Sequence, residues 1–187
     1  SLLAKRFKKL GTNVILFKSF KPWSITIILQ QLELRKNPQY YRVGIDSYFY
    51  NKSISDKKNM LYLETVGEQL NLFKSFTPRI SALELQSYLY NKSNSKFNIK
   101  KIIIYWKNGN VRGLRNLIFK TILSNKIYMP LYKAFFINRN IKMANKILTY
   151  LNAVNKTYFV IVGSGHLVGK KNILEILRTK GYKAVQL

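Results

Sequence analysis

The C-terminal stretch Thr157–Leu187, TYFVIVGSGHLVGKKNILEILRTKGYKAVQL, decides the fold expected for this chain. Its run Tyr158–Val162 is apolar and partly β-branched, which predicts a buried strand. A glycine-rich turn follows, then a predicted helix over Lys171–Lys180 that ends at Gly181, and a second short strand over Tyr182–Leu187. A strand–helix–strand unit needs further strands beside it. We therefore expect an α+β (α/β-like) fold, mostly helical with a small central sheet that missing N-terminal strands or a partner chain complete.

The turn between these elements carries His166, the only histidine of the chain. A turn at the carboxyl end of a strand is a usual place for ligands in α/β sheets, and imidazole is the side chain that titrates nearest to neutral pH. Gly163 and Gly165 would leave backbone N–H groups open there, so we expect them to contact a bound cofactor. The alternative is a tight turn whose histidine merely caps a helix. The glycine spacing GxGxxxG, with no acid about 20 residues on, argues against a dinucleotide site.

The rest of the chain is predicted to be mainly helical. Helices are expected over residues 1–10 (ending at Gly11), 21–35, 66–76, 81–90 and 111–123, and one long helix or two over 129–151, with a helix break at Asn37–Pro38 and a turn over 107–110. Asn59–Leu63 reads as a short strand. Val43–Asn51 and Phe97–Tyr105 fit either a helix or an extended segment.

Composition limits the classes of site that the chain can build. A hydrophobic fraction of 47% over 187 residues suits one folded domain, residues 1–187. Cysteine is absent and one histidine is present, which excludes disulfides, thiolate sites and any multi-histidine metal site within the chain. No apolar run approaches the ~20 residues of a membrane span.

The formal net charge of +26 has two interpretations. One is a polyanionic partner, either nucleic acid or an anionic membrane surface. The other is composition, because Lys, Asn, Ile, Tyr and Phe are abundant and all have A/T-rich codons. Lysine outnumbers arginine 25 to 8, although arginine is preferred for specific phosphate recognition.

Several motifs in order along the chain resemble the TraB/GumN family, also called PrgY- or Tiki-like. The C-terminal stretch is similar to the family pattern VGAGHLxGxxGLLxLLxxxGYxVxxL. The other motifs that resemble family patterns are Lys21-Pro22-Trp23 (l-x-P-W), Gly44–Phe49 (GVDxYF), Leu63–Leu70 (LETxxEQL), Trp106–Asn110 (WxxGD) and Asn138–Ala144 (ERNxxMA).

The resemblance implies a metal-dependent hydrolase, with peptide or protein substrates. The family's site combines two GxxH motifs on neighbouring strands with an acidic residue and an Arg-Asn pair. Carried over by motif, His166 would be a metal ligand and catalytic residue, and Arg139, Asn140 and Glu64 would be catalytic residues. Glu64 is otherwise read as a helix cap or surface acid. Many bacterial relatives are exported, which favours an extracytoplasmic location.

The chain departs from the family pattern at three places. The first GxxH is absent, and Asn138 and Asn110 stand where the family has acids. We therefore expect a divalent metal only if a second GxxH comes from outside this chain. Three explanations stay open: an N-terminal segment or subunit outside these residues, an inactive member kept for binding, or a degenerate member recruited into a basic, nucleic-acid-containing assembly such as a ribosome.

Overall fold

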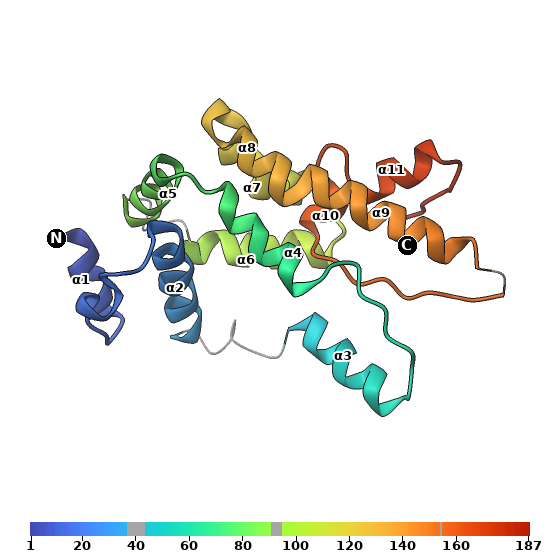
Figure 1. The fold of residues 1–187 in the computed structure, drawn as a ribbon, viewed down its shortest axis with the longest axis horizontal. Helices are drawn as coiled ribbons and strands as arrows, with labels where there is room; N and C mark the ends of the chain where they lie inside the picture. The colour runs from blue at the N-terminus through green and yellow to red at the C-terminus, as the bar shows by residue number, and fades with distance from the viewer. Residues whose placement is uncertain (37–43, 91–94, 154) are drawn as a thin grey trace. The chain divides into compact units, whose positions relative to one another are not determined.

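The computed structural model consists of helices and loops over the part of the chain that it describes, namely residues 1–36, 44–90, 95–153 and 155–187, with the backbone alone for residues 95–98 (Figure 1). The helical elements in chain order are α1 (Leu2–Lys9), η1 (Val14–Phe17), α2 (Pro22–Arg35), α3 (Ile45–Ser55), α4 (Val66–Leu72), η2 (Phe73–Ser75), α5 (Pro78–Tyr90), α6 (Ser95–Lys107), α7 (Val111–Ser124), η3 (Lys126–Tyr128), α8 (Met129–Tyr132), η4 (Lys133–Ile137), α9 (Asn138–Leu151), α10 (Gly165–Val168) and α11 (Ile173–Thr179).

The predicted central sheet is wrong, because the described residues include no strand. Asn59–Leu63, Tyr158–Val162 and Tyr182–Leu187, each predicted to be a strand, all lie in loops. Their composition suits a strand, but a strand is stable only where a neighbour exchanges ladder hydrogen bonds with it. Within the described ranges these segments form no such ladder, with each other or with another segment.

The ambiguous segment Phe97–Tyr105 lies within α6. Ile102 and Tyr105, three residues apart, both pack against one hydrophobic cluster, as the helical period requires. The other ambiguous segment, Val43–Asn51, is helical from Ile45 onward. The predicted break at Asn37–Pro38 lies outside the described residues.

Most of the helix predictions are confirmed. Ser1 caps α1, and Gly11 follows its end with φ of +80°, a conformation that favours glycine. Pro22 is the first residue of α2, where a missing N–H costs nothing. The segment 129–151, predicted as one long helix or two, consists of α8 and α9 with the single π-helical turn η4 between them.

Contacts divide the chain into two compact units. The first comprises Ser1–Met60 and Phe76–Asn94, and the second comprises Leu61–Ser75 and Ser95–Leu187. The prediction of one domain stays a prediction, since a domain can contain two units. In the first unit, α2 packs along α5, and Phe7, Ile25 and Leu29 form the buried centre.

The second unit has two hydrophobic clusters. Leu114, Phe119, Tyr132 and Val168 form one of them, and Met143, Ala144, Ile147 and Ile173 form the other, between α9 and α11, which lie side by side (Figure 1). Leu167 packs against both clusters. The short helix α10, which carries the predicted site histidine, is therefore held where the two clusters meet.

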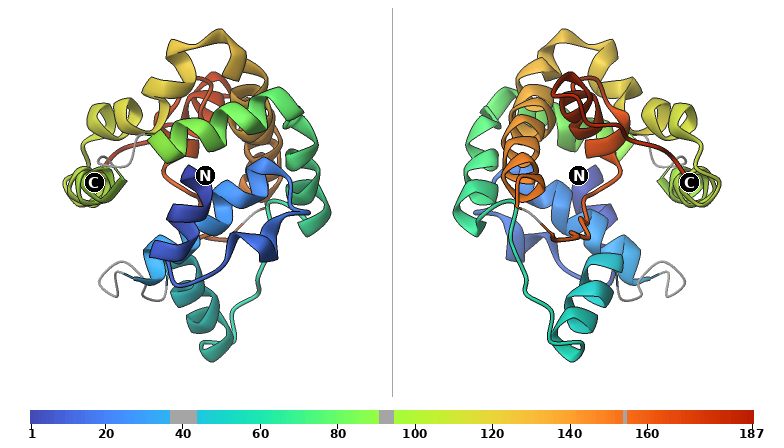
Figure 2. Two further views of the ribbon diagram at one scale, coloured as in Figure 1. Left: turned by 90° about the vertical axis from the view of Figure 1, so that its left-hand side faces the viewer. Right: turned by 90° about the vertical axis from the view of Figure 1, so that its right-hand side faces the viewer.

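Two further features of the described chain concern the character of its helices and the position of its C-terminal segment. None of the helices combines the length and hydropathy needed to cross a bilayer, when the described residues are searched. The C-terminal segment ends beside the turn between α6 and α7, where the Gln186 amide donates to the carbonyl of Gly109 over 2.9 Å (Figure 2).

The surroundings of two helical glycines predict opposite effects for their substitution by alanine. A Cβ on Gly113 would lie 2.7 Å from the Tyr105 ring, whereas a Cβ on Gly67 in α4 would meet only the Thr65 hydroxyl at 4.0 Å. We expect G113A to lower the free energy of unfolding by about 2 kcal/mol through overpacking. We expect G67A to raise it by about 0.5 kcal/mol through helix propensity. Urea unfolding measures both, and a stabilising G113A would contradict this packing.

Candidate functional site

The candidate site is built around the start of α9. The five residues before it, Lys133–Ile137, form the π-helical turn η4, and such turns in α-helices are frequent at functional sites. The Nη1 of Arg139 donates to the carbonyl of Phe135 in this turn over 3.1 Å. Arg139 and the next residue, Asn140, then point to different partners, because successive residues of a helix are about 100° apart.

Arg139 forms a two-bond ion pair with Glu64, which precedes α4. Its Nε and Nη2 donate to the two carboxylate oxygens of Glu64 over 2.7 Å each, with the two side chains 19% and 6% exposed. The hydrogen bonds and charge of Arg139 hold the pKa of Glu64 below its usual range, against the opposing effect of burial. At neutral pH this is therefore a buried, charged pair with no net charge.

The helix that follows Glu64 fixes its backbone. The Thr65 hydroxyl accepts from the N–H of Glu68, and the Glu68 carboxylate accepts from the N–H of Thr65, which forms a capping box at the start of α4. Lys142, one turn after Arg139 on α9, adds an exposed ion pair to Glu68. Glu64 and Arg139 are thus 75 positions apart in sequence, but the capping box of α4 and the ion pair of Lys142 with Glu68 keep their two segments in contact.

Asn140 is fully buried and joins α9 to the C-terminal segment. Its Nδ2 donates to the carbonyl of Lys171 over 2.9 Å, and its Oδ1 lies 2.6 Å from Nδ1 of His166. The loop that presents the Lys171 carbonyl is itself fixed, because the Lys171 N–H donates to Glu175 and the Asn172 side chain caps α11. The amide therefore has one defined orientation.

This orientation determines which nitrogen of His166 carries the proton. A carbonyl can only accept, so the Asn140 amide must direct its nitrogen to Lys171 and its oxygen to the ring. The Nδ1 of His166 is then the donor, and Nε2 keeps its lone pair. No hydrogen bond joins Nε2 to a described residue, and it is not among the buried unpaired atoms, so it reaches the surface.

The surroundings keep the imidazole neutral. The residue is 7% exposed, and burial lowers the pKa of His166 to about 4, with the positive charge of Arg139 acting in the same direction and Glu64 against it. A general base works best with a pKa near the working pH. At neutral pH the ring is therefore a weak base, and the lone pair of its Nε2 is not blocked by a proton.

The structure brings the four predicted catalytic residues together in two pairs, Arg139 with Glu64 and Asn140 with His166. Their catalytic roles stay predictions. Arg139 is not open to a substrate carboxylate, as its fork is taken by Glu64. The acid expected beside it at position 138 is not needed for this pair, since Asn138 is exposed on α9.

Asn110, which departs from the family pattern, and the two glycines predicted to bind a cofactor each have a structural role in the fold. The Oδ1 of Asn110 accepts from the N–H of Gly113 over 2.7 Å and caps α7, a role that Asn and Asp share. A Cβ on Gly165 would lie 2.8 Å from the Phe136 ring, so close packing explains this glycine. The carbonyl of Gly163 accepts from the His166 N–H over 2.9 Å. Cofactor contacts by the two glycines stay predictions.

Two participants were missed at the sequence level. One is the backbone carbonyl of Lys171, which no residue type in the sequence can indicate because every residue has a carbonyl. Phe136, whose ring centre lies 5.6 Å from that of His166, belongs to the pair Phe135-Phe136 just before Arg139. An aromatic pair one turn before the arginine was the available clue.

The described residues do not form a metal site by themselves. No group of three or more His, Cys, Asp or Glu side chains lies close enough to hold an ion in the parts of the chain described. His166 fits as a single ligand, because its free Nε2 is the donor that such a bond requires, whereas both oxygens of Glu64 are engaged by Arg139. A metal at this place would therefore need ligands beyond those that the described residues bring together.

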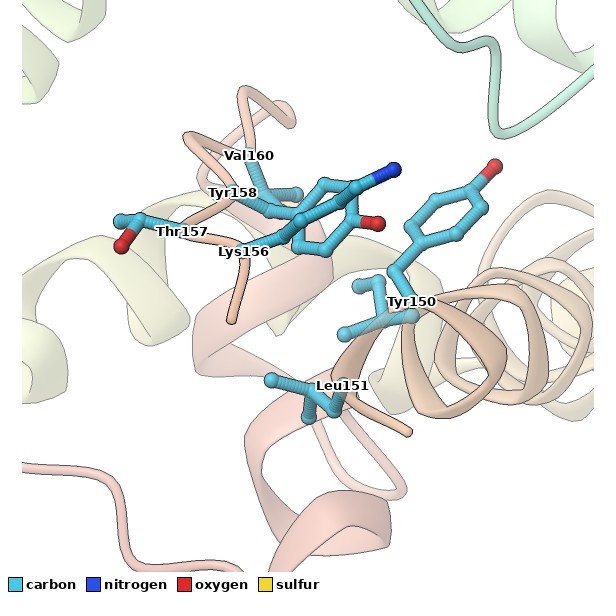
Figure 3. Close-up of a pocket in the computed structure, with 7 residues that line it drawn as sticks. Tyr150, Leu151, Lys156, Thr157, Tyr158 and Val160 are labelled. Atoms are coloured by element: carbon cyan, nitrogen blue, oxygen red, sulfur yellow. The ribbon is translucent and has the colours of Figure 1, made fainter. Parts of the chain in front are cut away.

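A separate pocket of about 260 Å³ lies at the end of α9 (Figure 3). Tyr150 and Tyr158 stack there with ring centres 5.3 Å apart, beside Leu151 and Lys156. None of the predicted site residues lines this pocket. It is therefore a different feature from the His166 network.

The ion pair predicts that charge removal at Glu64 is costly. E64Q leaves the guanidinium of Arg139 largely buried without its counter-charge, and we expect the free energy of unfolding to fall by about 3 kcal/mol. The control is E68Q, one turn away, which keeps the capping acceptor and breaks only an exposed pair, so that little change is expected. Equal effects of the two substitutions in urea unfolding would refute the pairing of Glu64 with Arg139.

Comparisons with known proteins place the chain in a family. A family model described as TraB/PrgY/gumN family matches residues 1–186. A protein of Amphimedon queenslandica named "Metalloprotease TIKI homolog" is 38% identical over 50 residues, which cover 26% of this chain and 10% of that relative's length. No solved structure matches the chain. The family match covers nearly the whole sequence, and the chain therefore belongs to the TraB/PrgY/gumN family.

Proposed function

We propose that this protein is a metal-dependent hydrolase that acts on peptides or proteins, with His166 as one imidazole of its catalytic centre. The observation that carries this proposal is the hydrogen bond from His166 to the buried Asn140, which leaves Nε2 as a free lone-pair donor. The name of the sponge relative, a metalloprotease homologue, supports the same class of reaction.

The low pKa of His166 favours a role as a metal ligand over a role as a general base. Metal binding requires neutral imidazole, and at pH 7 a ring with a pKa of about 4 is neutral in nearly every molecule. A divalent metal ion held by His166 and further ligands would supply Lewis-acid activation of the scissile carbonyl. The remaining ligands come, on this proposal, from outside the described residues.

The other residues of the network have positioning roles in this proposal. Asn140 fixes the tautomer and direction of the ring, as a hydrogen-bonded partner commonly does for a metal-binding histidine. The pair of Arg139 and Glu64 places two opposite charges near the ring, and they act on the pKa of His166 in opposite directions. Substrate binding through Arg139 would first require Glu64 to leave it.

The test is hydrolysis of a mixture of internally quenched peptides by the whole protein, with Mn²⁺, Co²⁺ or Zn²⁺ supplied or removed by EDTA. We expect H166A to abolish cleavage. H166N is the sharper variant, because an asparagine amide nitrogen takes about the place of Nδ1 and can keep the bond to Asn140, while no atom replaces Nε2.

Circular dichroism and thermal unfolding first establish that H166N is folded. Full activity of folded H166N would contradict the assigned role of Nε2. A wild-type protein that cleaves none of the peptides with any of these metals would contradict the proposed reaction itself.

A further inference from the structure

The second unit carries a strongly one-sided charge. Residues 95–174 include 15 lysines and arginines and no aspartate or glutamate. The acids of the second unit are Glu64 and Glu68, which pair with Arg139 and Lys142, and Glu175, which accepts from the N–H of Lys171, so they are far too few to neutralise this charge. Any partner of this surface is therefore expected to be anionic.

One face of α6 combines this charge with exposed apolar side chains. Ile103, Ile104 and Trp106 are 37%, 53% and 49% exposed, and Lys100 and Lys107 are exposed on the same side of the helix. On a helical projection these five residues span one face, and Ile102 and Tyr105 on the opposite face pack against the core. We call the five residues the α6 face.

The exposure of the α6 face is not required by folding. The helix already buries its inner side against the cluster around Leu114 and Phe119. Three large apolar residues that stay exposed together within about one turn of helix mark an interaction site more often than a scattered leucine does. Val111 and Arg112 at the start of α7, an apolar and a basic residue, are exposed as well.

The chemistry of the face favours lipid over nucleic acid. Isoleucine neither stacks on bases nor donates hydrogen bonds, whereas aliphatic side chains gain free energy on entering the acyl boundary of a bilayer. Tryptophan is enriched at that boundary because its ring is apolar and its N–H is polar. Lysine can lay its chain along apolar surface while its ammonium group stays at the level of lipid phosphates.

We propose that the α6 face is a docking surface for an anionic lipid bilayer. The protein lies on the bilayer with α6 roughly in its plane, and Ile103, Ile104 and Trp106 enter the interface. Lys100 and Lys107 contact lipid phosphates, and the remaining basic residues of the second unit are attracted to the anionic surface. This inference is independent of the proposed hydrolase reaction.

The two tryptophans of the chain make a site-specific test possible. In a W23F background, Trp106 is the only tryptophan, and Phe can keep the stacking on Phe76 in the first unit. With vesicles of phosphatidylcholine and phosphatidylglycerol (7:3), we expect a blue shift of Trp106 emission and quenching by brominated acyl chains. Binding should weaken steeply as salt rises and should be far weaker with phosphatidylcholine alone.

Paired variants separate insertion from charge. We expect I103Q/I104Q to weaken vesicle binding by about tenfold, because two inserted apolar side chains are lost. The matched control is I15Q/L16Q in η1, an apolar pair in the first unit that is 59% and 65% exposed and should leave binding unchanged.

Three results would overturn the proposal. The first is the absence of a Trp106 shift with anionic vesicles. The second is equal binding by I103Q/I104Q and the wild type. The third is a Trp106 response to a single-stranded RNA oligonucleotide without one to vesicles, which would identify the α6 face as a nucleic-acid surface instead.

Discussion

The buried amide of Asn140 is the interaction on which the candidate site depends. It joins α9 to the carbonyl of Lys171 and to the ring of His166, and a buried amide that lost either partner would remain unpaired at a cost of about 1–3 kcal/mol. Because the carbonyl can only accept, this one residue also decides the tautomer of the histidine. Fold stability and the chemistry of Nε2 therefore rest on the same two hydrogen bonds.

The neighbouring Arg139 extends the same hub in another direction. Its two bonds to Glu64 attach the loop before α4 to the start of α9, and its third bond satisfies a carbonyl of the π-helical turn. The consecutive Arg-Asn pair thus links three segments that are distant in sequence. A catalytic centre needs such rigid support, since small displacements of a ligand or base are costly.

The sequence was informative where the signal is local. Pro22, Gly11 and the helical period of the segment that contains α9 predicted their elements, and the motif order located His166, Asn140 and Arg139 in the sequence. The prediction of a sheet was wrong because a strand forms only beside a neighbouring strand, and an apolar run such as Tyr158–Val162 does not specify that neighbour. The ion pair between Arg139 and Glu64 was also not predictable. Glu64 lies 75 positions before Arg139, and nothing in the sequence around either residue shows that Glu64, and not an acid at position 138, is the partner of the arginine.

The most direct test of the account is the protonation state of His166, because it is the only histidine and its ¹⁵N resonances need no assignment. In ¹⁵N-histidine-labelled protein at pH 7, long-range ¹H–¹⁵N spectra should show a protonated Nδ1 and an unprotonated Nε2. On acidification these signals should change only as the pH approaches the pKa of about 4. A ring protonated at Nε2, or one that titrates near the ordinary value of about 6.5, would contradict the role given to Asn140.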